Sequence, residues 1–319
     1  MKKAILSWLL ILTSTITFAQ TVTVSGTVND QQGKPVAFAF ISESQHPYGT
    51  YSDANGAFTL KADPAANITV TASHYKTTTV KISDPAATKI ALEGGESGTD
   101  ANEVKANSTF FKQDESLVDM SFGSRSTFGQ GQESLHGSRF LFDNWAHGFA
   151  ITPKDSIKQN DVYLFNYDKI TGDLIFTRNQ KTVLQVIKSE IKAFTLFDPN
   201  AQPYVFEDVP SVDAKHYLQV LSSGKKYKIY KNLGTKFIKA NFTTNGITSS
   251  GNNYDEYVDQ STYYFVKLPG GQPQKLALKK KALKLAFAED ADKLNKFLAD
   301  NDGDIDDNYL KNLGDYINQ

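Results

Sequence analysis

The sequence predicts a mainly β protein with two β-rich domains and a helical end. Three observations support this: short segments of alternating apolar residues up to position 92, a second set dense in Tyr and Phe between 137 and 278, and helical apolar spacing after that. Residues 93–136 are rich in Gly, Ser, Gln and charge and keep no apolar period, which predicts a flexible linker. We therefore expect a seven-stranded β-sandwich at 20–92, an antiparallel β-rich domain at 137–278 and amphipathic helices at 279–319.

The first residues, "MKKAILSWLLILTSTITFAQ", have the layout of a secretory signal peptide at 1–19. Lys2 and Lys3 precede an apolar run of 13 residues, 4–16, and small residues lead to Ala19. A membrane anchor is the alternative, but a spanning helix needs about 20 apolar residues. No second long apolar run follows. We expect an exported chain without a transmembrane segment, located in the periplasm, at the outer membrane or outside the cell.

Composition limits the chemistry of the chain. There is no cysteine, which excludes disulfides, thiol nucleophiles, zinc–thiolate sites and a lipid-modified cysteine. Without Lys2 and Lys3, 32 of the 34 basic residues remain against 35 acidic ones, a net charge of −3. This balance predicts no nucleic-acid partner and no affinity for an anionic membrane.

The first domain shows a period of two along short segments, which suits a sandwich of about seven strands. We expect Val36, Phe38 and Phe40 to lie on one face of the second strand. The other apolar positions with this period are Val22, Val24, Val28, Phe58, Leu60, Ile68, Val70, Val80, Ile82, Ile90 and Leu92.

The stretch "YSDANGAFTL" raises a choice between a calcium loop and a hairpin turn. Asp53 and Gly56 repeat the three-residue offset of Asp30 and Gly33, and both pairs stand at junctions between predicted strands. A calcium loop needs more side-chain oxygens than this segment has. Asp at the start of a turn and Gly at its positive-φ position predict two hairpin corners.

At these residues the chain resembles the carboxypeptidase regulatory-like domain. The resemblance covers about 70 residues through "VSGTVNDQQGKPVAFAFI", "GTYSDANGAFTL" and "ITVTASHYKTTTVKI". It implies a transthyretin-like seven-stranded sandwich without catalytic residues, a module found on outer-membrane receptors and exported hydrolases. The positions that carry it are Gly26, Val28, Asp30, Gly33, Pro35, Ser52, Asp53, Gly56, Phe58 and Tyr75.

The second domain is expected to be an antiparallel meander, because its joints are short and contain Gly or Asn. The joints are "DKITGD", "SSGK", "NLGT" and "TNG". The expected strands are "DVYLFNY", "DLIFTR", "TVLQVI", "IKAFTLF", "HYLQVL", "KKYKIY", "TKFIKANF" and "TYYFVKL".

The start of this domain, "GSRFLFDNWAHGFAI", brings Arg139, Trp145 and His147 close together in sequence. Such aromatic density in an exported protein is consistent with a sugar-binding platform. Packing in a hydrophobic core is the alternative that we favour, because large aromatic side chains dominate core burial.

The last residues predict two or three amphipathic helices, with Phe287 and Phe297 as the anchors against the second sheet. The other periodic positions are Leu283, Ala291, Leu294, Ile305, Tyr309, Leu313, Tyr316 and Ile317.

Between two of these helices, Asp300, Asp302 and Asp304 have the spacing of an EF-hand start, but Ile305 and Lys311 occupy positions that require Gly and Glu. We expect Gly303 to end one helix and Asp304 or Asp306 to cap the next.

No motif assigns a reaction. The five histidines, at 46, 74, 136, 147 and 216, form no metal-binding pair, and no nucleophile elbow, P-loop or dinucleotide fingerprint is present. We therefore predict no catalytic, cofactor-binding or metal-binding residues and no cofactor.

The hypothesis is an exported, non-catalytic envelope protein with a binding or structural role and an envelope protein or glycan as partner. Two alternatives stay open. One is a carboxylate-based glycan hydrolase, because a sequence does not show which carboxylates meet in space. The other is an accessory subunit of an outer-membrane complex.

The signal peptide gives the first testable prediction. Mass spectrometry of the exported protein should find an N-terminus at or near Gln20, because Ala19 ends the small-x-small pattern. Intact Met1 in a membrane fraction would contradict it.

Overall fold

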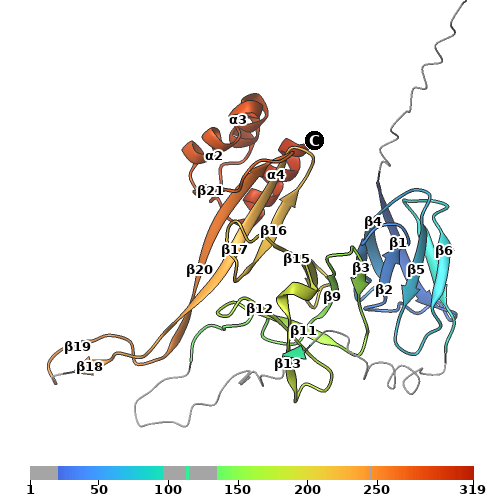
Figure 1. Ribbon diagram of the computed structural model, residues 1–319, viewed down its shortest axis with the longest axis horizontal. Helices are drawn as coiled ribbons and strands as arrows, with labels where there is room; N and C mark the ends of the chain where they lie inside the picture. Colours follow the sequence, from blue (N-terminus) through green and yellow to red (C-terminus); the bar gives the residue numbers. More distant parts are fainter. Residues whose placement is uncertain (1–20, 96–112, 115–134, 245) are drawn as a thin grey trace, which may run out of the picture.

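The computed structural model describes residues 21–95, 113–114, 135–244 and 246–319 (Figure 1). The predicted signal peptide and most of the predicted linker lie outside the described residues. The chain is mainly β, with several antiparallel sheets and helices near its C-terminal end.

The N-terminal domain is a β-sandwich of two sheets. The first has the order β4-β1-β7, in which β1 is antiparallel to β4 and parallel to β7. The second has the order β3-β2-β5-β6 and is antiparallel throughout. The strands are β1 (Val22–Asp30), β2 (Phe40–Glu43), β3 (Gly49–Tyr51), β4 (Ala57–Ala62), β5 (Asn67–Thr71), β6 (Thr78–Lys81) and β7 (Thr88–Leu92).

The predicted alternation fills the sandwich core, with one exception. Val36 is buried in that core, but Phe38 and Phe40 pack against a different cluster. The three residues therefore do not share a strand face, and that prediction was wrong. The physical reason is that Phe38 has a φ of 53°, which interrupts the extended backbone before β2 begins at Phe40.

Both predicted hairpin corners are confirmed. Asp53 Oδ1 accepts hydrogen bonds from the backbone N–H groups of Asn55 (2.8 Å) and Ala57 (2.9 Å), and Gly56 has a φ of 74°. Asp30 Oδ1 accepts in the same way from residues two and four positions later, at 2.9 and 2.8 Å. Each carboxylate thus closes its own turn, which is a structural role.

The second domain contains an eight-stranded sheet with the order β10-β9-β14-β15-β16-β17-β20-β21, and every neighbouring pair is antiparallel. A four-stranded antiparallel sheet has the order β11-β12-β13-β8. In the larger sheet the strands are β9 (His147–Ile151), β10 (Ile157–Lys158), β14 (Ala193–Phe197), β15 (Pro203–Asp208), β16 (Tyr217–Ser223), β17 (Tyr227–Ile238), β20 (Glu256–Lys267) and β21 (Gln274–Leu276). The smaller sheet has β8 (Gln113–Asp114), which comes from the predicted linker, and β11 (Leu164–Asp168), β12 (Asp173–Thr177) and β13 (Val183–Val186).

The two sheets share a core of aromatic side chains. Phe194 on β14 stacks on Phe206 of β15 with ring centroids 4.7 Å apart, and Tyr167 of β11 contacts Phe206 at 5.0 Å. All three rings are buried. This burial explains the density of Tyr and Phe in the sequence, since aromatic rings bury large areas when sheets stack.

One predicted joint is not a turn. "NLGT", residues 232–235, lies inside β17, where Gly234 pairs with Gln260 of β20. The predicted strands at 225–230 and 235–242 therefore belong largely to a single strand of 12 residues. Gly and Asn favour a turn locally, but the long pairing with β20 keeps this segment extended. Tertiary contacts therefore outweigh the local propensity here. Strands β9 and β15 were not predicted.

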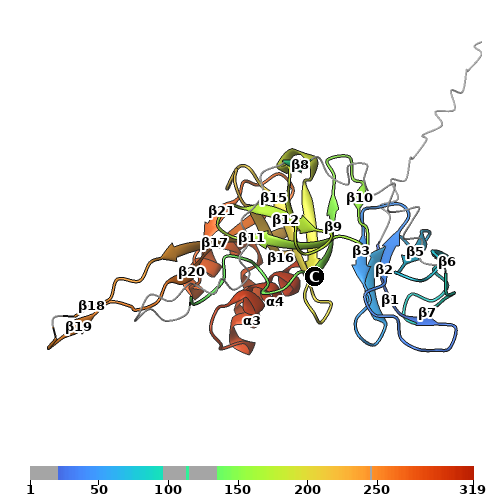
Figure 2. The same cartoon turned by 90° about the horizontal axis from the view of Figure 1, so that it is seen from below.

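Beyond Asn232, β17 has no partner in β16, and the β17–β20 pair continues as a two-stranded arm. The arm ends in the hairpin β18 (Thr243–Thr244) and β19 (Ser249–Ser250). It points away from the sandwich, and the two lie at opposite ends of the molecule (Figures 1 and 2). Its side chains include exposed Phe242 and Ile247.

Three helices, α2 (Lys280–Ala286), α3 (Ala291–Asp300) and α4 (Asp307–Asn318), confirm the predicted helical end. Their apolar side chains pack on Leu221, Tyr227, Ile229 and Phe265 of the large sheet. Both predicted anchors are buried: Phe287 contacts the ring of Tyr227 at 5.0 Å and Phe297 that of Tyr309 at 5.3 Å. Ala291, also expected on the apolar stripe, is exposed.

The acidic run between α3 and α4 is partly as predicted. Asp306 caps α4, because its carboxylate accepts from the N–H of Tyr309 at 2.8 Å. Gly303 does not end α3, which stops at Asp300 with Asn301 in an extended conformation. The side chain and N–H of Asn301 both donate to Phe297 O, which satisfies the helix end without a glycine.

The buried anchor predicts a large effect on stability. Replacing Phe297 by Ala should lower the free energy of unfolding by about 3–5 kcal/mol, because it leaves a cavity between α3, α4 and the sheet. Leu285→Ala is the control, since Leu285 is 72% exposed and should cost less than about 0.5 kcal/mol. Denaturant unfolding measures both, and equal values for the two variants would contradict the docking.

Candidate functional site

The N-terminal sandwich and the large sheet meet through four buried rings, Phe40, Tyr51, Phe149 and Phe197, which we call the aromatic seam. Tyr51 lies 5.1 Å from Phe40 and 5.0 Å from Phe197, measured between ring centroids. Phe40 and Tyr51 come from the sandwich, and the other two rings come from β9 and β14. The domains are therefore joined by an apolar contact as well packed as a core.

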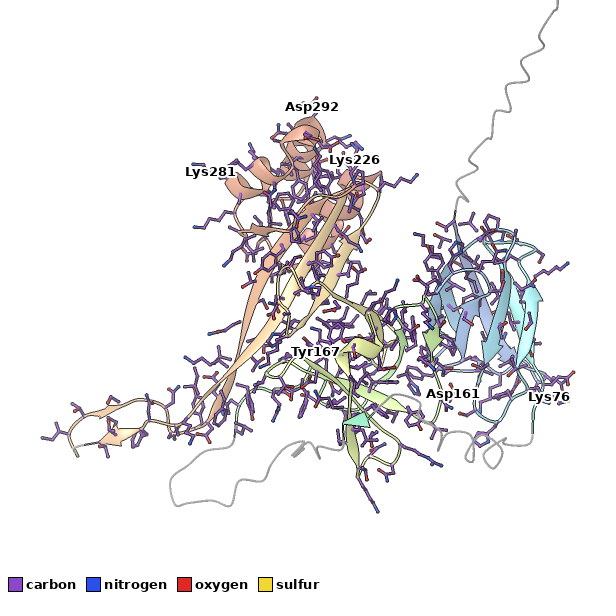
Figure 3. The ribbon with its side chains drawn as sticks, viewed as in Figure 1. Lys76, Asp161, Tyr167, Lys226, Lys281 and Asp292 are labelled. Carbon is purple, nitrogen blue, oxygen red and sulfur yellow. The ribbon has the colours of Figure 1, made fainter. Side chains whose placement is uncertain are left out.

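A polar network crosses the same seam. The Tyr51 hydroxyl donates to Gly148 O at 3.2 Å and accepts from Gln159 Nε2 at 3.1 Å. Gln159 Nε2 also donates to Asp161 at 2.6 Å, on the side of the second domain that faces the sandwich (Figure 3). Burial raises the pKa of the Tyr51 hydroxyl and that of the Asp161 carboxyl. These hydrogen bonds favour one relative position of the two domains. A shift of one domain would leave buried polar groups unpaired, which costs free energy.

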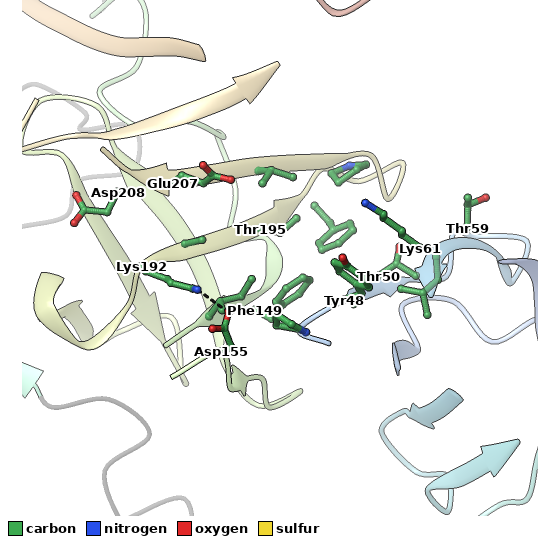
Figure 4. A pocket seen from close by; sticks show the side chains of 18 of the residues that line it. Tyr48, Thr50, Thr59, Lys61, Phe149, Asp155, Lys192, Thr195, Glu207 and Asp208 are labelled. Atoms are coloured by element: carbon green, nitrogen blue, oxygen red, sulfur yellow. Dashed lines mark hydrogen bonds and ion pairs between the residues drawn. The ribbon is translucent and has the colours of Figure 1, made fainter. Parts of the chain in front are cut away.

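Beside the seam lies a cleft of about 620 Å³, the interdomain cleft, whose walls come from both domains (Figure 4). Its size suits a small ligand or a short stretch of polymer, and domain interfaces are common positions for such sites. Tyr48, Thr50, Thr59 and Lys61 line it from the sandwich. The opposite wall includes Phe149, Ile151, Thr195, Phe197, Pro203 and Val205.

Three carboxylates line the cleft, and each has a lysine partner. Asp155 pairs with Lys192 at 2.6 Å, a contact visible in Figure 4. Glu207 binds Lys228 through both carboxylate oxygens at 2.8 Å. The remaining pair is Asp208 with Lys188, at 3.1 Å.

Glu207 has a second partner, because the Tyr230 hydroxyl donates to it at 2.7 Å. Burial and this carboxylate raise the pKa of Tyr230. Across the cleft, the Lys61 ammonium lies over the Tyr48 ring, 5.3 Å from its centroid. The cleft thus offers apolar walls, hydroxyl groups and charges of both signs, a chemistry suited to a polar ligand with apolar faces, such as a glycan or peptide.

Arg139, Trp145 and His147 do not form one site. The Arg139 guanidinium is paired with the buried carboxylate of Asp168. Trp145 packs against a core cluster that includes Ile175, which agrees with the core interpretation. His147 stacks on Phe38 at 4.6 Å, and burial lowers its pKa.

The other candidate residues also have structural roles. His46 and His216 bond to Glu43 and Asp213 three residues away in sequence, at 2.8 and 2.9 Å. Asp302 pairs with Lys280 at the surface. Within the ranges that the structure describes, no three His, Asp or Glu side chains are grouped to hold a metal ion. No helix there has the length and apolar character that a membrane crossing requires.

Sequence reasoning missed every residue of the interdomain cleft. Asp155 stands about 50 positions before the adjacent pair Glu207 and Asp208, and no motif links these carboxylates to each other or to Lys61. The one available signal was the aromatic stretch at 137–151, which includes β9 and contributes Phe149.

Comparison with known families identifies the first domain. Residues 24–105 match the model of the CarboxypepD_reg-like domain. The N-terminal sandwich is therefore a carboxypeptidase regulatory-like domain, as the sequence motifs indicated. No curated protein matches the chain.

The seam gives a prediction about stability. Tyr51→Phe should lower the free energy of unfolding by about 1–3 kcal/mol, because it leaves Gln159 and Gly148 O without their buried partner. Tyr75→Phe is the matched control within the same domain, and there the change should be below about 0.5 kcal/mol. Urea unfolding followed by fluorescence measures both. A Tyr51→Phe variant as stable as the control would show that the hydroxyl network contributes nothing.

Proposed function

We propose that this chain is an exported, non-catalytic envelope protein that binds a glycan or a protein segment in its interdomain cleft. The observation that carries the proposal is the cleft itself, walled by both domains and lined with aromatic rings and lysine-paired carboxylates. Ligand sites are concave, largely apolar and carry a few placed polar groups, and this cleft has those properties.

The family match supports a role without catalysis, since regulatory-like domains are typically non-catalytic. The three-stranded and four-stranded sheets suit the seven-stranded transthyretin-like sandwich that the resemblance implies. Export rests on the signal peptide predicted from Lys2, Lys3 and the apolar run after them. The proposed location is the periplasm, the outer membrane or the cell exterior.

A carboxylate-based glycan hydrolase is the second candidate, because Asp155, Glu207 and Asp208 line one cleft. Hydrolysis of a glycosidic bond uses two such groups on opposite sides of the bond. An accessory role in an outer-membrane complex is the third candidate, and it requires a protein ligand.

The test is binding to fractionated envelope glycans and envelope proteins, with a variant that fills the cleft. Thr59→Trp places a large ring at an exposed cleft position on β4 and should weaken binding by about tenfold or more. Thr79→Trp is the matched control, at an exposed position on β6 that does not line the cleft. Calorimetry or surface-immobilised binding reports the affinity.

Each outcome separates the candidates. Equal loss in both variants, or no saturable binding to either fraction, would contradict the cleft as the binding site. Release of sugar from a glycan, abolished by Glu207→Gln or Asp155→Asn, would establish the hydrolase instead. Binding confined to the protein fraction would favour the accessory role.

A further inference from the structure

A second hollow, of about 490 Å³, lies at the junction of the two domains. Phe38 lines it from the sandwich, and the segment 141–147 and the turn after β14 line it from the second domain. We call it the aromatic hollow. Phe197 lines both this hollow and the interdomain cleft, so the two sites are neighbours that share one ring.

The walls of the aromatic hollow present several ring systems. Phe38 is stacked on His147, and Phe142 is supported edge to face, at 5.1 Å, by Tyr204, which does not itself line the hollow. Phe142 and Trp145 are both partly exposed. The exposed part of each ring is surface that a ligand in the cavity can contact.

The charge of the aromatic hollow differs from that of the interdomain cleft. Asp143 and Asp198 line it, while no Lys or Arg does among the described residues. Burial lowers the pKa of His147, the one other titratable group in its walls, which favours the neutral imidazole. The hollow is therefore anionic, whereas lysines balance every carboxylate in the cleft.

The two carboxylates retain capacity for a ligand. Asp143 is exposed and forms no ion pair within the described ranges. Asp198 uses Oδ1 to accept from the N–H groups of Asn200 (2.8 Å) and Gln202 (2.9 Å), which closes its own turn. Its Oδ2 is left without a donor from the described residues.

We propose that the aromatic hollow binds an organic cation, an alkylammonium group carried either by a small molecule or by a lysine side chain of a polypeptide. The ring faces attract a cation through their quadrupole, and the two carboxylates supply the opposite charge. An anionic ligand is disfavoured by the same carboxylates. This site is separate from the proposed function and does not depend on it.

Trp145 provides a direct reporter for the test. The sequence has two tryptophans, Trp8 and Trp145, so Trp145 is the single tryptophan of a chain beginning at Gln20 and can be excited selectively over the tyrosines. Choline, a quaternary ammonium ion, should change this fluorescence saturably, and the effect should weaken at high salt. Its neutral carbon isostere, 3,3-dimethylbutanol, should bind about tenfold or more weaker.

The two sources of the cation are separated by a peptide arm. The peptide acetyl-Gly-Lys-Gly-amide is titrated beside the same peptide with an acetylated lysine, which has no charge. A stronger response to the lysine peptide than to choline identifies a polypeptide as the source, and the reverse order identifies a small molecule. In either case the charged member of each pair should bind more tightly than the neutral member.

Asp143→Asn should weaken choline binding by about fivefold or more, because it removes one of the two charges. Asp292→Asn is the matched control, an exposed Asp on α3 remote from the hollow (Figure 3). Circular dichroism and the melting temperature confirm that both variants fold.

Equal binding of choline and its isostere, no response to any cation, or equal losses in Asp143→Asn and Asp292→Asn would each overturn the proposal. Thr59→Trp, which fills the cleft, should leave choline binding unchanged when the binding is measured by calorimetry, because the added tryptophan interferes with the fluorescence of Trp145. The experiments can therefore contradict cation binding in the aromatic hollow without contradicting the proposed function, and the reverse also holds.

Discussion

The contact between the two domains depends on the four buried rings of the aromatic seam, and two glycines leave room beside them. A Cβ on Gly49 would lie 2.9 Å from the ring of Phe40, and one on Gly148 would lie 2.7 Å from Thr195 O. Both positions border the aromatic seam, and Gly148 O is also the acceptor for Tyr51. Each of these close approaches lies within one domain: the missing Cβ of Gly49 leaves room for the Phe40 ring, and that of Gly148 for the pairing of β9 with β14.

Both candidate sites follow from this contact. Neither the sandwich nor the large sheet encloses the cleft or the hollow alone, because Tyr48, Lys61 and Phe38 come from one domain and the remaining walls from the other. Phe197 belongs to the seam and lines both sites.

A second organising feature is the 12-residue strand β17. Side chains on one of its faces contact three different parts of the structure. Side chains two or four positions apart point the same way along a strand. Near its start, Tyr227 and Ile229 receive the helices. Further along, Leu233 enters the core between the sheets, and Phe237 lies on the arm. The helices dock closely here because Gly314 of α4 meets Ser222, and Asn318 bonds to both backbone groups of Tyr227.

Features that depend on a few neighbouring residues could be predicted from the sequence. The Asp30 and Asp53 corners, the alternation of the sandwich strands, the helical end and the Asp306 cap were predicted, because a turn, a strand face or a cap is decided within about four positions. The regulatory-like domain was identified for the same reason, since its motifs are such turns.

The other features arise from contacts between distant parts of the chain. "NLGT" has the composition of a turn, but pairing with β20 keeps it extended. Phe38 does not lie on the expected strand face and instead stacks on His147. The seam joins Tyr51 to Gly148, 97 positions away, and the cleft adds charges from Asp155 and Glu207. Such contacts form when whole domains pack, and local propensity carries no information about which distant surfaces will meet.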